Sequence, residues 1–380
     1  MTVTTEHRRL RLDLVGHLSR SAMLSDPSVA AALAVVDRHH YAPAVYRVDQ
    51  RGRMGEMLVA TDPAHRRSYL EAVYSDEAIV TQVSPTGIPT SSSTQPGVMA
   101  VMLEALRLRP GMDVLEIGTG TGYNAALLCA IVGDEHVTSV DIDPTLVDDA
   151  ITALAETGFA PTVVAADGLG GWPVRSPYDR VIATCSVRRV PTAWLAQTRP
   201  GGIVLANLSY GVVALAVEAD GSGEGRFLPQ VAAFIEARPA DGPTGPTSGE
   251  MVARCTDDPM PGAPARPEDV ELLTARDSEF FWQLGEPSVS SCTMLPDDGE
   301  IHCLVDSATG SWARVENLTS GVTVAQGGPR RIWDAVVTWC RRWEAAGRPA
   351  HDRLGLTVTA DGAHEVWVDE PGSAHRWRLS

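Results

Sequence analysis

Between residues 112 and 207, short apolar runs typical of strands alternate with longer runs that have the spacing of helices. The strand candidates are residues 112–117, 136–140, 162–166, 178–183 and 202–207. The clearest helix candidates between them are residues 124–132 and 144–157. Strands that alternate with helices in this way form a parallel sheet covered on both faces. The sequence therefore predicts an α/β domain in its centre.

The first of these strands ends in a glycine-rich turn, Glu116-Ile-Gly-Thr-Gly-Thr-Gly-Tyr-Asn124, which opens a helix. Such a turn brings the backbone close to a ligand at a helix N-terminus. The glycines at 118, 120 and 122 depart from the dinucleotide spacing G-x-G-x-x-G, so a nicotinamide cofactor is the weaker interpretation. The carboxylate of Glu116 suits a cationic ligand that carries an amino-acid group. S-adenosylmethionine, which has a sulfonium and an ammonium, is therefore favoured.

Acidic residues follow two further strands. Asp141 ends the second strand, where a carboxylate can accept both ribose hydroxyls, and Asp167-Gly168 ends the third, within reach of an adenine amino group. Each of them taken singly is as well explained by a helix cap or a turn, and Asp143 before Pro144 is expected to be such a cap. Because ligands of open α/β sheets bind at the carboxyl ends of the strands, the set together indicates a cofactor site.

The rest of the chain suggests further parts. We expect a helical N-terminal region over residues 1–75, with a loop or hairpin insertion near 44–71, and a catalytic domain over 76–238. Proline and glycine cluster over 239–267, which predicts a linker or long loop. Residues 268–380 combine hairpin turns with an amphipathic helix containing Trp333 and Trp343, which predicts a smaller α+β domain. Those tryptophans are expected in its core. The alternative is that this domain binds a peptide, either along an exposed strand edge by backbone pairing or in a groove beside the helix.

Composition narrows the classes of function. The net charge of -17 offers no broad basic surface, so nucleic acid and an acidic membrane surface are poor partners. No apolar run approaches the roughly 20 residues that span a bilayer, and the polar N-terminus does not resemble a secretory signal. Six scattered cysteines without a C-x-x-C pair, and histidines without ligand spacing, favour reduced thiols and predict no metal. A cytoplasmic protein is expected.

Several motifs together resemble the protein-L-isoaspartate O-methyltransferases. The glycine turn, Asp167-Gly-Leu-Gly-Gly-Trp172 and Pro177-Tyr-Asp-Arg-Val-Ile182 occur in the order and spacing of that family. Val36-Asp-Arg-His-His-Tyr-Ala-Pro43 and Ala72-Val-Tyr-Ser-Asp76 are similar to its N-terminal signatures. The resemblance covers about residues 10–235 and implies a class I S-adenosylmethionine methyltransferase fold, with a Rossmann-like, mostly parallel sheet and S-adenosylhomocysteine as the cofactor product.

The resemblance also implies the site residues. Ser92-Ser-Thr-Gln-Pro96 corresponds to the family's active-site segment, with Thr94 at the position of its serine, so Thr94 and the neighbouring Ser93 are the candidate catalytic residues. Thr94 as a simple helix cap is the alternative. The candidate cofactor contacts are Glu116, Gly118, Thr119, Gly120, Gly122, Asn124, Asp141, Ile142, Asp167 and Gly168. The candidate substrate contacts are Ser92, Thr184, Arg188 and Arg189, although surface solvation is the commoner role of an arginine pair. Arg51, Arg53, Arg66 and Arg67 form a second candidate basic patch.

Three features depart from the family pattern: threonine at 94, the insertion after Pro43, and a chain that continues far beyond residue 235. This layout, with Cys185-Ser-Val-Arg-Arg-Val-Pro191, is more similar to a branch that accompanies ATP-grasp peptide ligases. The resemblance to that branch implies methylation of an aspartate in a cross-linked ribosomal peptide of the graspetide type, followed by closure to an aspartimide. General repair of isoaspartate in proteins is the alternative, and a non-catalytic cofactor-binding partner of a peptide ligase is a third interpretation.

Overall fold

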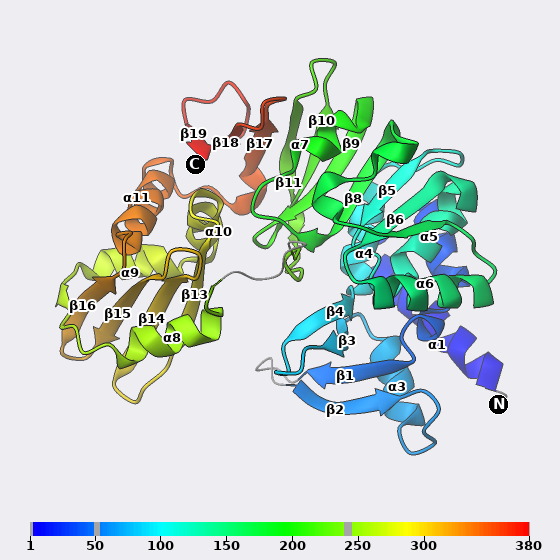
Figure 1. Ribbon diagram of the computed structural model, residues 1–380, viewed down its shortest axis with the longest axis horizontal. Coiled ribbons are helices and arrows are strands. Elements are labelled where there is room, and N and C mark those ends of the chain that lie inside the picture. The colour runs from blue at the N-terminus through cyan, green and yellow to red at the C-terminus, as the bar shows by residue number, and fades with distance from the viewer. Residues whose placement is uncertain (1–2, 49–53, 239–244, 380) are drawn as a thin grey trace.

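The computed structural model describes residues 3–48, 54–238 and 245–379, and its strands form three sheets (Figure 1). A ten-stranded sheet contains the predicted strands of the central domain. A four-stranded sheet comes from the N-terminal region, and a five-stranded sheet comes from the C-terminal part. In Figure 1 the five-stranded sheet lies at the left, apart from the N-terminal sheet at the lower right.

The N-terminal region begins with the two predicted helices. Asp26 caps the second of them by accepting hydrogen bonds from the backbone of Ser28 and Val29. The insertion after Pro43 forms a hairpin and a helix, and the hairpin joins the antiparallel sheet β2-β1-β3-β4. Arg51, Gly52 and Arg53 lie outside the described residues. The elements are α1 (Val3–Arg20), α2 (Pro27–Val35), β1 (Ala44–Val48), β2 (Met54–Val59), α3 (Arg66–Val73), β3 (Ile79–Val83), β4 (Pro89–Ser93) and α4 (Pro96–Ala105).

The central strands pair as the sequence predicts. β9, β8, β5, β6 and β7 are neighbours in that order and all their pairings are parallel. Val114, Leu115 and Ile117 are buried on β5, which explains why that strand reads as a continuous apolar run. The elements are β5 (Val114–Ile117), α5 (Tyr123–Val132), β6 (Val137–Asp141), α6 (Pro144–Glu156), β7 (Thr162–Ala165), β8 (Tyr178–Ser186), α7 (Thr192–Ala196) and β9 (Thr198–Leu208).

The sheet then continues with five antiparallel strands, so only half of its strands are parallel. β10 (Gly211–Val217) and β11 (Gly223–Val231) follow β9 through tight turns. β17 (Leu354–Val358), β18 (His364–Val368) and β19 (Arg376–Leu379) complete the sheet, with β17 paired to β11. In Figure 1 these last strands, in red, lie beside green β11. The ten-stranded sheet therefore includes strands from both the central and the C-terminal parts of the chain.

The predicted linker over 239–267 is wrong for its described part. Residues 239–244 lie outside the description, but Thr247 and Glu250 form a capping box that starts α8 (Ser248–Asp257). Met251 and Cys255 of this helix are buried against the five-stranded sheet. The sheet has the order β12-β16-β15-β14-β13 and comprises β12 (Ala263–Pro264), β13 (Val289–Met294), β14 (Gly299–Asp306), β15 (Ser311–Leu318) and β16 (Gly321–Gly327).

The prediction of a separate domain over 268–380 is also corrected. α9 (Pro267–Thr274), α10 (Arg276–Gly285) and α11 (Ile332–Ala345) pack between the two larger sheets in one continuous apolar core. Phe280 of α10 contacts Phe227 of β11 edge to face, with ring centroids 4.9 Å apart. Trp333 and Trp343 are buried in this core, as expected. The packing joins the C-terminal part to the ten-stranded sheet.

All six cysteines are free thiols, four of them buried. Among the described residues, no helix combines the length and apolar character needed to cross a membrane.

Candidate functional site

The glycine turn lies at the carboxyl end of β5 and requires glycine for two reasons. Gly118, Gly120 and Gly122 have φ angles of +96°, +51° and +83°, which L residues with a side chain rarely adopt. A Cβ atom on Gly118 would also lie 2.8 Å from Oγ1 of Thr184, and one on Gly122 would lie 3.1 Å from Cβ of Ala150. The turn is thus held close to β8 and α6, and α5 begins directly after it at Tyr123.

Glu116 is the buried acidic residue beneath this turn. Its carboxylate accepts hydrogen bonds from Nδ2 of Asn124, at 2.7 Å, and from the hydroxyl of Ser139. Burial raises the pKa of Glu116 to about 7, these two hydrogen bonds oppose the shift, and Asp141 adds to it. Within the described structure, Oδ1 of Asn124 is buried without a hydrogen-bond partner. Glu116 and Asn124 therefore offer acceptors to a positively charged ligand.

Asp141 ties the glycine turn to the end of β6. Its two carboxylate oxygens accept the backbone N–H groups of Gly120, at 2.8 Å, and of Asp143, at 3.0 Å. Asp143 caps α6 through the N–H of Thr145, as predicted. Asp141 is 8% exposed and borders the pocket, so further lone pairs of its carboxylate face the space beside the turn.

Asp167 and Gly168 follow β7 at the same edge. One oxygen of Asp167 accepts the N–H of Leu169, which shows that this residue is both a cap and a wall of the pocket. A Cβ atom on Gly168 would lie 2.6 Å from a methyl carbon of Ile117. Nε1 of Trp194 donates to the Gly168 carbonyl at 2.8 Å. Glycine at 168 thus permits close packing of this loop on β5.

The opposite wall of the pocket comes from β4 and the residue after it. Ser92, Ser93 and Thr94 all border the pocket. Gln95, and not Thr94, occupies the cap position of α4, and the Thr94 hydroxyl has no hydrogen-bond partner among the described residues. The simple cap interpretation of Thr94 is therefore not supported, and its hydroxyl is available to a ligand.

Arg38 positions this segment from behind. The guanidinium, fully buried, donates to the carbonyls of Ser93 and Thr94, at 3.0 and 2.9 Å, and to the hydroxyl of Ser93. It also donates to three carbonyls of the segment after α3, those of Val73, Ser75 and Glu77. Burial lowers the pKa of Arg38 to about 10, so it stays charged at neutral pH. The Ser93 hydroxyl is thereby engaged within the protein, in contrast to that of Thr94.

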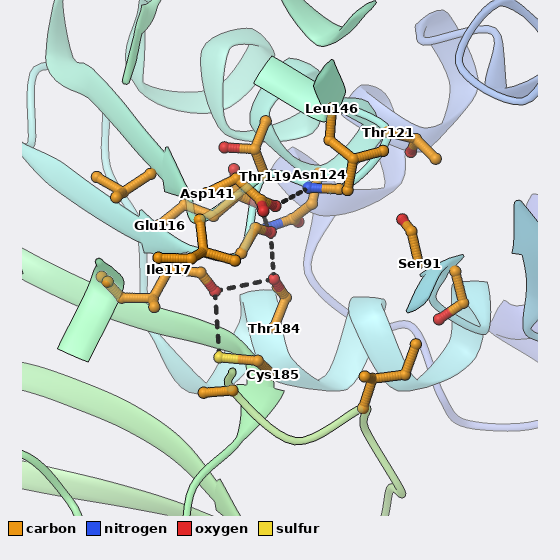
Figure 2. Close-up of a pocket in the computed structure, with 18 of the residues that line it drawn as sticks. Ser91, Glu116, Ile117, Thr119, Thr121, Asn124, Asp141, Leu146, Thr184 and Cys185 are labelled. Atoms are coloured by element: carbon orange, nitrogen blue, oxygen red, sulfur yellow. Dashed lines mark hydrogen bonds between the residues drawn. The ribbon is translucent and has the colours of Figure 1, made fainter. Parts of the chain in front are cut away.

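The predicted residues that line this one pocket are Ser92, Ser93, Thr94, Glu116, Gly118, Thr119, Gly120, Asn124, Asp141, Ile142, Asp167, Gly168 and Thr184. Figure 2 shows Glu116, Asp141, Asn124 and Thr184 on one side of it and Ser91 of β4 across from them. The Thr184 hydroxyl donates to the Gly118 carbonyl at 2.6 Å, so it supports the turn. Gly122 shapes the turn without lining the pocket.

Arg188 and Arg189 do not line this pocket. Nε of Arg188 lies 2.6 Å from a carboxylate oxygen of Glu236, and Arg189 donates to the carbonyl of Leu284. The cation that does border the pocket is Arg238, in a segment over 235–238 that the sequence did not indicate. This segment returns after β11 and pairs with the end of β8, because Ser186 exchanges backbone hydrogen bonds with Ile235 and Ala237. No local motif marks it.

Another polar cluster lies outside this pocket, where Asp37, His39 and His40 bring potential ligand atoms within 4.8 Å of one another. Asp37 is paired with Arg11 and accepts from the Tyr74 hydroxyl, and His39 is hydrogen-bonded to Tyr74. Burial, followed by the neighbouring His7 and His40, lowers the pKa of His39 to about 4. These contacts give the cluster a structural role in joining α1 to the segment after α2 and to the end of α3.

The pocket fits S-adenosylmethionine in its chemistry. Glu116 and the unpartnered oxygen of Asn124 offer acceptors to an ammonium, Asp141 offers a carboxylate to ribose hydroxyls, and the glycine turn leaves room for close approach. Ile142, Leu146 and Leu169 add apolar walls suited to an adenine ring.

Comparison with known proteins agrees with this chemistry. Residues 48–221 match the sequence model of the family described as protein-L-isoaspartate(D-aspartate) O-methyltransferase. A protein-L-isoaspartate O-methyltransferase of Staphylothermus marinus is 33% identical over 205 residues, which cover 52% of this chain and 77% of that protein. A protein of the same name from Ignicoccus hospitalis is 43% identical over 112 residues, which cover 29% of this chain and 53% of that protein. The chain thus spans about half of the second relative's length.

A solved structure named protein-L-isoaspartate O-methyltransferase shares the fold with a TM-score of 0.56 at 21% identity. The alignment covers 95% of this chain and 100% of that chain, so the shared fold takes in most of the C-terminal part as well. The fold is that of a class I S-adenosylmethionine methyltransferase. On the strength of these matches, the chain belongs to the protein-L-isoaspartate O-methyltransferase family, which consists of carboxyl methyltransferases that use S-adenosylmethionine.

Proposed function

We propose that the protein transfers a methyl group from S-adenosylmethionine to an aspartyl-type side-chain carboxylate of a peptide, leaving S-adenosylhomocysteine. The observation that carries this proposal is the composition of one pocket. The glycine turn with Glu116 and Asp141 forms one wall, and the strand end with the free hydroxyl of Thr94 forms another.

When bound, S-adenosylmethionine supplies a methyl group that is already activated by the sulfonium, and a carboxylate oxygen is nucleophilic enough at neutral pH to accept it without a general base. The contribution of the protein is therefore to orient the acceptor and to exclude water. Thr94 is suited to hold one carboxylate oxygen by donating its hydroxyl, which directs the other oxygen toward the methyl carbon. Arg38 fixes the backbone on which Thr94 stands.

Charge supports an acidic acceptor at this place. Arg238 borders the pocket in a chain whose net charge is -17, and its positive charge supports an acidic acceptor in this pocket. Thr94 and Arg238 come from segments on different elements, and both face the space beside the cofactor wall. The two residues together define the acceptor side of the proposed site.

For the substrate, we propose a ribosomally made peptide cross-linked by an ATP-grasp ligase, whose methyl ester closes to an aspartimide when the next backbone nitrogen attacks the ester. This part rests on the resemblance of the Cys185–Pro191 region and of the layout to that branch of the family. The C-terminal part is not distinctive by itself, because a solved protein-L-isoaspartate O-methyltransferase shares the fold over 95% of this chain. The names of the relatives favour repair of isoaspartyl residues as the second candidate.

Mass spectrometry of three peptides separates these functions. The probes are one sequence with a normal aspartate, the same sequence with L-isoaspartate, and the same sequence after cross-linking by an ATP-grasp ligase. Preferred esterification of the cross-linked peptide, followed by loss of methanol, supports the biosynthetic role. Preference for the isoaspartyl peptide supports repair. If none of the three is methylated although S-adenosylhomocysteine binds, the protein is a non-catalytic cofactor-binding partner and the proposal is wrong.

A further inference from the structure

The outer edge of β13 has no strand beside it in the described structure, because β13 ends the five-stranded sheet. Val289 donates its N–H to the carbonyl of Glu286 and not to β14, although it stands opposite Asp306. Backbone groups alternate between the two sides of an antiparallel strand. The N–H and C=O groups of Ser291 and Thr293 therefore point away from β14, toward the open edge.

Two cavities lie between this edge and the cofactor pocket. A first cavity lies between β13 and the catalytic sheet, bordered by Ser290 and Ser291 on one side and by Ser186, Val187 and Arg188 on the other. A second cavity of 710 Å³ continues past Arg188 to Arg238 and is closed on its far side by residues 245–247 and by Ser307 and Ala308. Glu236 borders both of these and the cofactor pocket, so the three adjoin one another, and together they are called the groove below. Figure 1 shows β13 as the strand of its sheet nearest to the catalytic sheet.

The middle of this groove is locally basic. The described residues around the second cavity include Arg188, Arg189 and Arg238 but a single carboxylate, Glu236, which is paired with Arg188. The chain as a whole carries a net charge of -17. A local excess of cations on an acidic protein attracts an acidic ligand and repels a basic one.

We propose that this groove binds the substrate as an extended acidic peptide that adds a strand to the free edge of β13. The backbone of the peptide pairs with the outward groups of Ser291 and Thr293, and its carboxylates face Arg188 and Arg238. The peptide then continues past Glu236 and presents one side chain to the acceptor wall at Thr94. This inference rests on the proposed methyl transfer to a peptide, and it names how that peptide is held.

An edge strand binds peptides without regard to their sequence, whereas the charges of the groove select acidic peptides. Each new backbone hydrogen bond replaces a hydrogen bond to water in the free protein, so each bond at the edge adds only modestly to the binding free energy. The arginines favour peptides with several carboxylates. A cross-linked peptide fits such an edge only where a stretch of it stays extended.

Direct binding tests the groove apart from catalysis. The probe is a fluorescein-labelled acidic peptide of about ten residues with one L-isoaspartate, which extends over roughly 30 Å at roughly 3.3 Å per residue. Ser291→Pro removes one outward N–H at an edge position that tolerates proline, and Ser291→Ala is the matched control that keeps it. We expect about tenfold weaker binding for Ser291→Pro and little change for Ser291→Ala.

Two further measurements guard against a misfolded variant. The same peptide with alternate N-methylated residues is expected to bind the unchanged protein about tenfold more weakly. Arg188→Glu is expected to weaken binding of the acidic peptide and to reduce its dependence on salt, with no effect on S-adenosylhomocysteine affinity. Equal affinities for the N-methylated peptide and the peptide without N-methyl groups would overturn the proposed edge pairing. If self-association through β13, detected as a dimer that Ser291→Pro dissolves, excludes the peptide, the proposal is also wrong.

A failure of the proposed function has a different signature. If the acidic peptide binds with the expected dependence on Ser291 but is not esterified, the proposal of peptide binding in the groove is supported and the proposal of methyl transfer is wrong. If a short isoaspartyl tripeptide is esterified and the long peptide binds no more tightly than the tripeptide, the proposal of methyl transfer is supported and the proposal of peptide binding in the groove is wrong.

Discussion

The two walls of the pocket are built differently. The cofactor wall comes mainly from one continuous stretch over residues 116–169, in which β5, β6 and β7 each deliver one turn to the same edge, and Thr184 of β8 supports the first of these turns. The acceptor wall comes from residues 90–94 and 235–238, which meet only when distant parts of the chain have folded. The cofactor wall therefore depends on local backbone geometry, and the acceptor wall depends on long-range contacts such as those of Arg38.

Breaking the cofactor wall is expected to have the largest effect. Gly118→Ala places a side chain at a φ of +96° and a Cβ atom 2.8 Å from Thr184 Oγ1. The backbone strain and the displaced turn are expected to lower S-adenosylhomocysteine affinity at least about a hundredfold. Isothermal titration measures this. Gly158→Ala is the matched control, because Gly158 has a φ of +86° but open space around it. If both variants bind normally, the turn does not hold the cofactor.

The second largest effect is expected for the acceptor wall, and it is tested by changing Arg38, which holds the backbone of that wall. Arg38→Lys keeps the charge but cannot reach the carbonyls on both sides of the original guanidinium. We expect a loss of about 2–4 kcal/mol in the free energy of unfolding and weaker methyl transfer, with cofactor affinity retained by the folded fraction. Urea denaturation measures the free energy of unfolding, and isothermal titration measures the cofactor affinity. Arg67→Lys, at an exposed ion pair, serves as the control with little expected change. Equal stability of the two variants would contradict the positioning role.

A smaller effect is expected from the free hydroxyl of the acceptor wall. Thr94→Ala is predicted to lower kcat/KM for the peptide about 30-fold without changing S-adenosylhomocysteine affinity, whereas Thr94→Ser retains most activity. Initial rates of methyl ester formation measure this. Thr90→Ala is the control, because the Thr90 hydroxyl already donates to Gln82. Normal rates for Thr94→Ala would remove Thr94 from the reaction.

The smallest effect concerns pH. The folded pKa of Glu116 is raised from 4.5 to about 7, so the folded state holds a proton that the unfolded state has lost. In the cofactor-free protein this group therefore costs stability increasingly as pH rises from about 4.5 through 7, and the cost is complete above that range. The stability of Glu116→Gln relative to the original protein should rise by on the order of 1 kcal/mol between pH 5.5 and 7.5. A difference that does not vary with pH would show that Glu116 is ionised throughout.

The contrast between the walls also explains what the sequence could predict. The glycine turn, Asp141 and Asp167 were recognisable because each follows its strand directly, and α11 was recognisable by its apolar spacing. Arg238 was not recognisable from the sequence, since only the pairing of Ser186 with residues 235–237 brings it to the pocket. The interpretation of residues 268–380 as a separate domain failed for the same reason. The pairing of β17 with β11 joins residues more than a hundred positions apart, and no local pattern reports it.

The pairing of β11 with β17 has a consequence for the history of such chains. The small sheet and its helices lie in sequence between two neighbouring strands of the large sheet. They are thus nested inside the methyltransferase and do not trail behind it. A simple truncation after β11 would expose that strand along with the face that α10 covers, so a shorter ancestor could gain or lose this unit cleanly only through paired breakpoints. Engineers who wish to graft another unit onto this fold should exchange the segment between those strands and keep the strands after it.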